Sequence, residues 1–395
     1  GLVNSGHEVT LAYTSIDGKS YSEAGIRMIE ANESIDFNPP PNPYAMGKKP
    51  GSFGEYTKLI KYYFDPFSVS MFKASKWLCS ENDLVIGHSI CHTLSTAAAL
   101  HTCPRVALAL APMVVRSNMV SPTGESFGAL VNSTMWSLGD GVSSRLWFKE
   151  GKSIREKNGL PRVKSLQSEI FTSDLLTIVA CSPNLVNRPN DWPGSAVLTG
   201  FLSPKGEEKE VPRDVQVFLN EGEAPIYMTF GSCMEFQPKH FTNLMIGAAL
   251  QSGKRAIIQT NIDHPAFNTS ENLIRVDQTQ HASVFPKCSL IVHHGGAGTT
   301  QSALLAGKPS VVIAHGFDQP YWAQQLYNSG VGGRPLLIDS VTESDINLAI
   351  QEVLQSSTMA EKAKQVAAGM KKEDSVKRSV QMIEHAMSKL NSNQA

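Results

Sequence analysis

Apolar residues come in short runs along this chain, and helical patterns lie between the runs. In the second half the runs fall at residues 226–229, 256–259, 273–275, 290–292 and 310–313. Apolar residues stand side by side in these runs, which is typical of strands buried on both faces of a parallel sheet. A helical pattern such as residues 238–252 separates successive runs. Strands alternating with helices predict an α/β fold built on parallel sheets.

The first half shows the same alternation less regularly. Strand patterns fall at residues 7–13, 26–29, 84–86, 106–110, 177–180 and 197–201. Helical patterns cover residues 55–79 and 92–101, and the Pro- and Gly-rich residues 35–54 predict a long loop. A charged, Pro-bounded linker at 203–212 separates the two halves. We therefore expect two Rossmann-like, doubly wound domains facing each other across a cleft.

The expected domain boundaries follow from the linker. Residues 1–202 form an N-terminal domain and residues 213–395 a C-terminal domain. The last helical pattern, residues 359–390, is a candidate to pack back on the first domain. A chain of 395 residues is long enough for two hydrophobic cores.

The composition of the chain limits the kinds of molecule that the protein is expected to bind. The chain is 41% hydrophobic and 18% charged, with a formal net charge of −1, so nucleic acid is not expected as a partner. No apolar run has the length of a membrane span, which leaves peripheral membrane contact only. Six cysteines without a CxxC pair predict free thiols in a reducing compartment, here the cytoplasm, and no zinc site.

The first residues predict a chain that begins inside a domain. Residues 1–7 have the pattern of a last helical turn, with Gly6 as the residue that ends it. A strand should precede that helix in a βα unit. We therefore expect the native N-terminus upstream, and the sequence does not decide whether a targeting segment is present.

A glycine-rich turn after the strand at 290–292 carries most of the chemical information. The chain passes Gly295, Gly296 and Gly298 into a helix expected to begin near Thr299 and Thr300. Glycine lets the backbone approach a ligand, and the first N–H groups of a helix have no partners within it. This arrangement predicts a phosphate site.

Asp318 and Gln319 follow the next strand, so the parallel topology places them at the same edge of the sheet. A carboxylate and an amide can hold the hydroxyls of a sugar. Phosphate recognition beside these groups predicts a nucleotide-sugar site.

These motifs resemble the donor-binding signature of family 1 glycosyltransferases, in the branch of bacterial antibiotic and sterol or lipid enzymes. The likeness rests on HHGGAGTT at 293–300, AGKP at 306–309 and DQPYWA at 318–323. QHASVFP at 280–286 resembles the uridine-side loop, and YMTFGS at 227–232 resembles the first strand and turn of the C-terminal domain. In the first half, residues 6–9 and 83–86 match only general patterns.

The resemblance implies a GT-B fold and an inverting transfer of a hexose from a UDP- or dTDP-sugar to a hydroxyl of an apolar small molecule or lipid. It implies no metal or other cofactor. His294 would contact the diphosphate, Thr299 its oxygens, and Asp318 with Gln319 the sugar. The full set of expected donor-binding residues is Gly231, Ser232, His281, His294, Gly295, Gly296, Gly298, Thr299, Thr300, Asp318 and Gln319.

The resemblance leaves the catalytic base unassigned. Relatives carry it in a loop after the first strand, which precedes the residues present here, so the chain starting at Gly1 is expected to bind donor but transfer poorly. His88 is the candidate for the acceptor site, and it stands where many relatives have Asp. His293, one residue before His294, is expected to be a packed strand residue.

Two other function classes stay open. Residues 87–91 (GHSIC) approach the nucleophile elbow of α/β-hydrolases, with Ser89 as nucleophile, although Cys91 replaces the closing glycine. His88 and His92 have metal-ligand spacing but no third ligand, so a metal site is not expected. The chain could also be a non-catalytic nucleotide-sugar binder.

Overall fold

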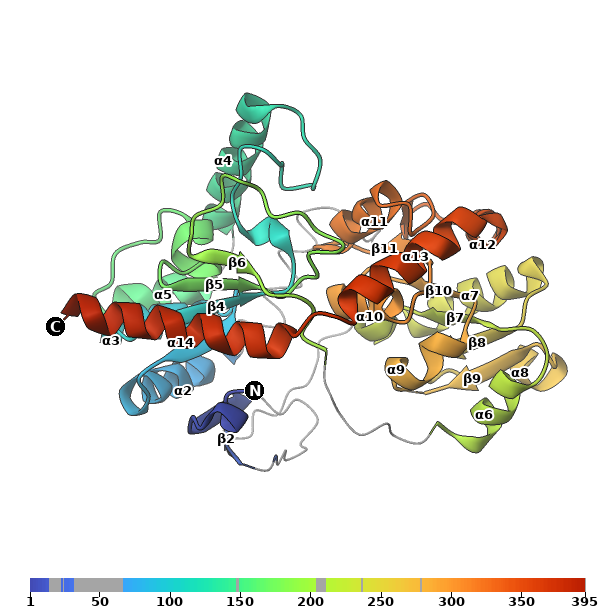
Figure 1. Cartoon of the computed structure of the whole chain (residues 1–395), viewed down its shortest axis with the longest axis horizontal. Helices are drawn as coiled ribbons and strands as arrows, with labels where there is room; N and C mark the ends of the chain where they lie inside the picture. The colour runs from blue at the N-terminus through green and yellow to red at the C-terminus, as the bar shows by residue number, and fades with distance from the viewer. Residues whose placement is uncertain are drawn as a thin grey trace.

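The computed structural model describes residues 1–13, 23, 25–31, 67–146, 149–203, 211–235, 237–277 and 279–394. Its strands form three parallel sheets, two in the first half and one in the second (Figure 1). The expected α/β fold with parallel sheets is confirmed. The predicted loop at 35–54, the first part of the helical pattern at 55–79 and residues 204–210 of the linker lie outside the described residues.

The described residues of the first half form six strands in two sheets. A two-stranded sheet pairs β1 (Val9–Tyr13) with β2 (Ile26–Glu30). The second sheet has the order β3 (Val85–His88), β4 (Arg105–Ala109), β5 (Leu176–Val179) and β6 (Ala196–Leu198). The helices are α2 (Ser68–Glu81), α3 (His92–His101), α4 (Ala129–Leu146) and α5 (Lys149–Lys157), with short helices η1 (Val3–Ser5), η3 (Pro112–Val114) and η4 (Gln167–Phe171).

The second half holds one six-stranded sheet with the order β12-β11-β10-β7-β8-β9. Its strands are β7 (Ile226–Thr229), β8 (Ala256–Gln259), β9 (Leu273–Val276), β10 (Leu290–His293), β11 (Ser310–Ala314) and β12 (Leu336–Leu337). Its helices are α6 (Arg213–Asn220), η5 (Gly231–Glu235), α7 (Pro238–Ser252), α8 (Ala266–Thr269), α9 (His281–Val284), η6 (Phe285–Lys287), α10 (Ala297–Leu305), α11 (Gln319–Asn328), α12 (Glu343–Gln355), α13 (Ser357–Met370) and α14 (Ser375–Gln394). The strand order reverses between β7 and β10, which is where open α/β sheets bind ligands.

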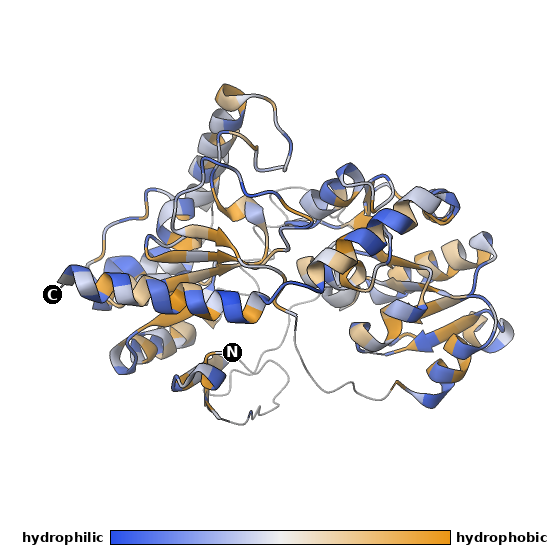
Figure 2. Ribbon diagram, in the orientation of Figure 1, coloured by the Kyte–Doolittle hydropathy of each residue, from blue (hydrophilic) through white to orange (hydrophobic). Residues whose placement is uncertain are grey.

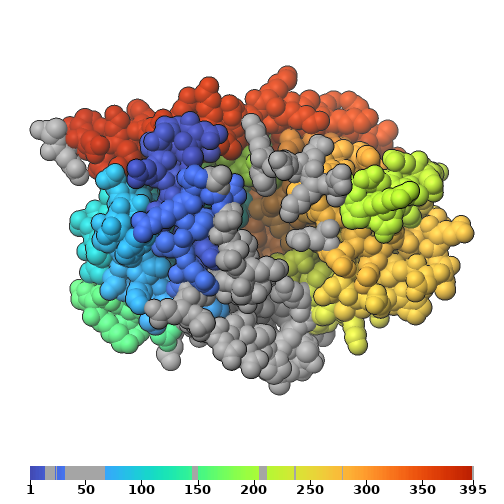
Figure 3. Space-filling model, turned by 90° about the horizontal axis from the view of Figure 1, so that it is seen from below, coloured from blue at the N-terminus to red at the C-terminus, as the bar shows by residue number. Residues whose placement is uncertain are grey.

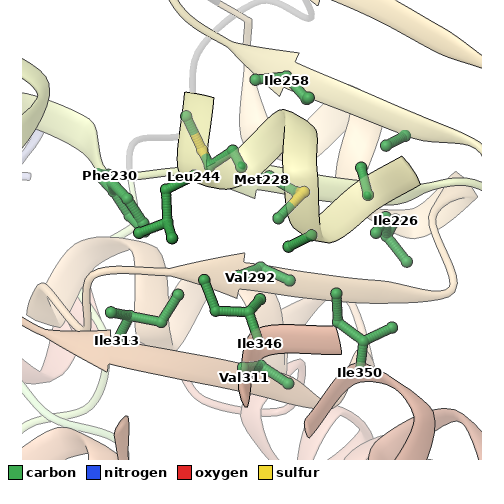
Figure 4. Close-up of a cluster of buried hydrophobic side chains, with 14 of the residues drawn as sticks. Ile226, Met228, Phe230, Leu244, Ile258, Val292, Val311, Ile313, Ile346 and Ile350 are labelled. Carbon is green, nitrogen blue, oxygen red and sulfur yellow. The ribbon is translucent and has the colours of Figure 1, made fainter. Parts of the chain in front are cut away.

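The continuous apolar runs explain why this sheet is central. Every residue of β7, β10 and β11 is buried. On one face Met228, Val292 and Ile313 pack against α7 and α12, as Figure 4 shows with Leu244 and Ile346. Figure 2 shows the same distribution, with apolar strands inside and the polar faces of the helices outside.

The two halves share a core. Buried residues of the first half, such as Val179 and Trp192, pack in one cluster with Leu304 and Trp322 of the second half. Gln301 connects the halves through two buried hydrogen bonds. Its Nε2 donates to the carbonyl of residue 180 (3.1 Å), and its Oε1 accepts from the N–H of residue 182 (2.9 Å).

Helix α14 belongs to the second half in sequence but packs on the first. Ile383 lies in a cluster with Val106 and Ile178 of the first sheet, and Leu2 packs against the same cluster. His7 lies 3.0 Å from a carboxylate oxygen of Glu384. Figures 1 and 3 show α14 (red) running across the first half beside the first residues (blue).

Two expected helix boundaries need correction. The helical pattern predicted at 359–390 is two helices, α13 and α14, separated at residues 371–374. The break lets Glu373 accept hydrogen bonds from the side chain of Asn184 (2.7 Å) and the N–H of Phe201 (3.3 Å) in the first half. Helix α10 begins at Ala297, ahead of the expected Thr299.

Candidate nucleotide-sugar site

Three turns meet at the carboxyl edge of the second sheet, where β7, β10 and β11 are neighbours. The turn after β7 contains Gly231, the turn after β10 contains Gly295, and the turn after β11 leads to Gln319. A Cβ built on Gly295 would lie 3.1 Å from the carbonyl oxygen of Gln319, so these two turns touch. Most of the expected donor-binding residues therefore come together at one place.

His294 lies between two glycines of this site. A Cβ on Gly231 would lie 2.7 Å from Cε1 of His294, and one on Gly296 would lie 2.5 Å from its Nε2. Gly231 also has φ +52 and Gly295 has φ +88, conformations that favour glycine. The glycines of the motif are thus required both by backbone conformation and by the space that the imidazole occupies.

Burial keeps His294 neutral in the free protein. Desolvation, and then the neighbouring His281, lower the pKa of His294 to about 4. Its Nδ1 is buried and accepts or donates no hydrogen bond within the described part of the chain. A neutral imidazole here can offer an N–H to an anion, and the anion's charge would in turn favour the protonated ring.

His293 has the structural role expected for it. It is 0% exposed, and its Nδ1 accepts the N–H of Gly295 (3.0 Å), which fixes the start of the glycine turn. Desolvation lowers its pKa well below the usual range.

The first turn of α10 presents backbone N–H groups to the site. Gly296 is the N-cap, and Gly298 and Thr299 lie within the first turn, with Gly298 exposed and Thr299 half-buried. Thr300 is 0% exposed, and its N–H donates to the carbonyl of Gly296 (2.9 Å). Thr299 therefore keeps part of its surface open to solvent, whereas Thr300 is fully buried.

The side chain of Gln319 is engaged by the protein itself. Its Oε1 accepts the N–H groups of His315 (2.7 Å) and Gly316 (3.2 Å), and its Nε2 donates to Sγ of Cys233 (3.5 Å). These bonds hold the turn after β11. Oδ2 of Asp318 accepts from Nε1 of Trp322 (3.0 Å), while desolvation raises the pKa of the Asp318 carboxyl.

His281 and Ser232 flank the three turns. His281 stacks on Phe285, with ring centroids 4.2 Å apart, and faces the edge of Tyr227. Desolvation lowers the pKa of His281 to about 4. Ser232 is exposed in η5, directly after the glycine that contacts His294.

Sequence reasoning missed His315. Its ring meets the edges of Phe230 and Phe241 at centroid distances of 5.0 and 4.9 Å, and its Nε2 is buried without a hydrogen-bond partner in the described residues. Desolvation and the nearby His294 lower its pKa to about 3. A lone histidine in a loop gave no sign of this aromatic environment.

The hydrolase hypothesis does not fit the structure. Ser89 is 1% exposed, so its hydroxyl is not presented to a substrate as a nucleophile must be. His88 is the last residue of β3, and its Nδ1 accepts the N–H of Ile90 (3.3 Å). Desolvation lowers the pKa of His88. The side chain of His92 lies against Ser68 instead (3.4 Å).

The first half offers an apolar surface. Leu130, Val131, Leu138 and Val142 are exposed on one face of α4, and Phe127 precedes them. The loop before α4 also touches the second half, because a Cβ on Gly124 would lie 2.6 Å from the ring of Tyr321. No helix in the described part of the chain is both long and apolar enough to cross a membrane.

Comparison with known proteins places the chain among similar sequences and structures. Residues 256–385 match the family described as the C-terminal domain of erythromycin biosynthesis protein CIII-like proteins. A sterol 3-beta-glucosyltransferase of Arabidopsis thaliana is 32% identical over 206 residues, which are 49% of this chain and 31% of that protein. An O-mycaminosyltylonolide 6-deoxyallosyltransferase of Streptomyces fradiae is 27% identical over 206 residues, covering 51% of this chain and 48% of that one.

Solved structures share the whole fold. The glycosyltransferase of kitacinnamycin superposes with a TM-score of 0.71 at 17% identity, over 98% of this chain and 93% of the other. VinC, a glycosyltransferase solved in complex with dTDP, superposes with a TM-score of 0.64 at 15% identity, over 98% and 94%. The expected GT-B architecture is confirmed.

The chain has the GT-B fold, and the candidate site lies at the carboxyl edge of the sheet in its second half. More particularly, residues 256–385 resemble the C-terminal domain of erythromycin biosynthesis protein CIII-like proteins, and the relatives that match about half of the chain carry the names of sugar transferases. The chain spans about a third of the length of the Arabidopsis relative and about half of the Streptomyces relative.

Proposed function

We propose that this chain transfers a hexose from a UDP- or dTDP-sugar, bound by the second half, to a hydroxyl of an apolar acceptor bound by the first. The observation that carries the proposal is His294, a buried neutral imidazole seated between two glycines beside the start of α10. A diphosphate placed there would meet unpaired N–H groups and the positive end of a helix dipole.

The reaction is a displacement at the anomeric carbon. The acceptor oxygen forms a bond to C1 as the bond from C1 to the diphosphate oxygen breaks, and the acceptor proton leaves to a base. Attack from the face opposite the diphosphate inverts C1. His294 and the first N–H groups of α10 stabilise the charge that grows on the leaving diphosphate. Because these groups offset that charge, we propose that transfer needs no metal ion, and activity should persist in EDTA.

Apolar acceptors are supported by the first half. Helix α4 exposes Leu130 and Leu138, and the relatives include proteins named for sterol and tylonolide derivatives. His88 is the candidate to contact the acceptor, since it ends β3 and is neutral at pH 7 after desolvation lowers its pKa. The cytoplasm stays the expected compartment, because six scattered cysteines without a CxxC pair suit a reducing environment.

The decisive variant is His294→Gln. Calorimetry should show UDP or dTDP binding to the wild type and binding at least tenfold weaker to the variant, because a hydrogen bond to a charged group contributes about 1.5–3 kcal/mol. His101→Ala, an exposed histidine at the end of α3, is the matched control and should bind as the wild type does.

Transfer is measured separately, by mass spectrometry of products from UDP- and dTDP-hexoses with a panel of sterols and polyketides. Nucleotide binding without any product would fit both a non-catalytic binder and an enzyme whose base lies upstream of Gly1, and product from a longer chain that carries the upstream residues would exclude the first. Equal nucleotide binding by the wild type and His294→Gln would contradict the assignment of the site.

A further inference from the structure

Cys79 and Cys103 are distant in sequence but lie in one cluster of the first half. Cys79 stands in the last turn of α2 and is 8% exposed. Cys103 follows α3, which ends at Thr102 in a left-handed conformation, and it packs against the same cluster as Cys79. Phe72 of α2 and Leu94 of α3 belong to this cluster too, so the packing of the two helices brings the cysteines together.

The two thiols are also hydrogen-bonded to each other. Cys103 donates its own S–H to the carbonyl of Asn82, the residue that ends α2 (3.8 Å). Desolvation, and then the charge and hydrogen bond of Cys103, raise the pKa of Cys79 to about 12. Desolvation raises the pKa of Cys103 as well, but the hydrogen bond with Cys79 lowers it. The opposite signs of the two hydrogen-bond effects identify Cys79 as the donor and Sγ of Cys103 as the acceptor.

The other four cysteines have partners of a different kind. Each forms a hydrogen bond with an oxygen or nitrogen atom: Cys91 with Thr93, Cys181 with the carbonyl of residue 110, Cys233 with Gln319 and Cys288 with the carbonyl of residue 284. Cys91 is the nearest of these to Cys103 in sequence, but the two stand at opposite ends of α3, about 15 Å apart along its axis. Cys79 is therefore the thiol within reach of Cys103.

We propose that Cys79 and Cys103 form a modification site, at which a mild oxidant produces a disulfide that joins α2 to the segment after α3. The inference does not depend on the proposed function. Asn82 and Pro104 stand shortly before β3 and β4, so the bond lies at the amino ends of these strands. His88, the candidate to contact the acceptor, ends β3 at the opposite edge of the sheet.

With hydrogen peroxide as the oxidant, the reaction balances in two steps. The sulfur of Cys103, the more open of the two, attacks one peroxide oxygen, so that Cys103 becomes a sulfenic acid and water leaves. The sulfur of Cys79 then attacks the sulfur of Cys103, and the sulfenic hydroxyl leaves as a second water with the proton of Cys79. The two thiols lose two electrons in all, and the peroxide gains them.

The rate of oxidation should depend steeply on pH. Because desolvation raises the pKa of both thiols, only a small fraction of either is thiolate at pH 7. The rate should therefore rise about tenfold per pH unit between pH 7 and pH 9. The disulfide closes a loop that contains β3 and α3, which restricts the unfolded chain. The Tm of the oxidised protein should be about 5 °C higher than that of the reduced protein, and dithiothreitol should reverse the difference.

Peptide mapping of the wild type identifies the bond directly. Trypsin and a glutamate-specific protease release residues 77–81 and 82–105 as separate peptides, because Glu81 lies between the two cysteines. After the folded protein has been treated with hydrogen peroxide and its remaining thiols have been alkylated, these peptides should appear as one species that reduction separates. Cys91 lies in the second peptide too, so Cys91→Ser is the matched control. It should keep both the linked peptides and the increase in Tm on oxidation.

Cys103→Ser should show neither the linked peptides nor the increase in Tm. The inference is overturned if the two peptides of the oxidised wild type stay separate, or if the link persists in Cys103→Ser. Loss of the link in Cys91→Ser would show that Cys91 is the true partner and would overturn it as well. An equal increase in Tm in Cys103→Ser would also contradict the inference, because the added stability would then come from another cysteine.

Discussion

Replacing His315 with Phe should make the protein less sensitive to acid. His315 packs against Phe230 and Phe241, and its buried Nε2 has no hydrogen-bond partner in the described residues. A phenyl ring can occupy the same position without a polar atom. His315→Phe should therefore be as stable as the wild type, or more stable, at pH 7.

The size of this effect on stability follows from the pKa of His315, which desolvation lowers from 6.5 to about 3. A lowered folded-state pKa means that the stabilising contribution is present above pH 6.5 and is lost as the pH falls toward 3. Between pH 7 and pH 5 the unfolded chain takes up this proton while the folded chain does not. One such histidine then removes about 2 kcal/mol of stability over that interval. The variant should lose about 2 kcal/mol less than the wild type.

Urea unfolding of both proteins at pH 7 and pH 5 measures this difference. Phe241→Leu is the matched control, because it loosens the same cluster but leaves His315 able to titrate. It should be less stable than the wild type by about 1 kcal/mol at both pH values. The decrease in its stability between pH 7 and pH 5 should equal that of the wild type. If His315→Phe and the wild type lose the same stability between pH 7 and pH 5, the assignment of this acid sensitivity to His315 is wrong.

Two further variants test the geometry of the site and of the interface. Gly295→Ala places a Cβ 2.8 Å from a methyl of Val312, at a residue whose φ is +88. The variant should therefore have a Tm several degrees lower and bind UDP more weakly. An unchanged UDP affinity in calorimetry would show that the turn is not part of the site. Gln301→Ala leaves a buried N–H and a buried carbonyl of the first half unpaired. The free energy of unfolding, measured in guanidinium, should therefore fall by about 2–4 kcal/mol. A decrease below about 1 kcal/mol would mean that water replaces both hydrogen bonds.

The sequence predicted the parts of this protein that depend on local pattern. Nearly continuous apolar runs marked β7, β10 and β11, because a strand covered on both faces is apolar at most of its positions. The glycines of the turn after β10 were also visible, since the φ of Gly295 requires one.

Features that depend on distant partners could not be predicted. Nothing near Gln301 in sequence indicates that its amide forms hydrogen bonds with the backbone of residues 180 and 182. Likewise, nothing near His315 indicates that its ring packs against Phe241. One missed signal was local. Thr342 and Asp345 form a capping box that starts α12, and the T-x-x-D spacing was there to be used.

Helix α14 follows the second half in sequence but packs on the first half, and this constrains the order in which the protein can fold. Ile383 and its neighbours cover the face of the first sheet formed by Val106 and Ile178, yet they are synthesised after nearly all of the second half. The ribosome makes nearly all of the second half before that cover exists. The first half must therefore wait, with an apolar face open to water, until α14 has been synthesised. During that interval it is a natural client for chaperones, and an expression strain rich in them should raise the yield of folded protein.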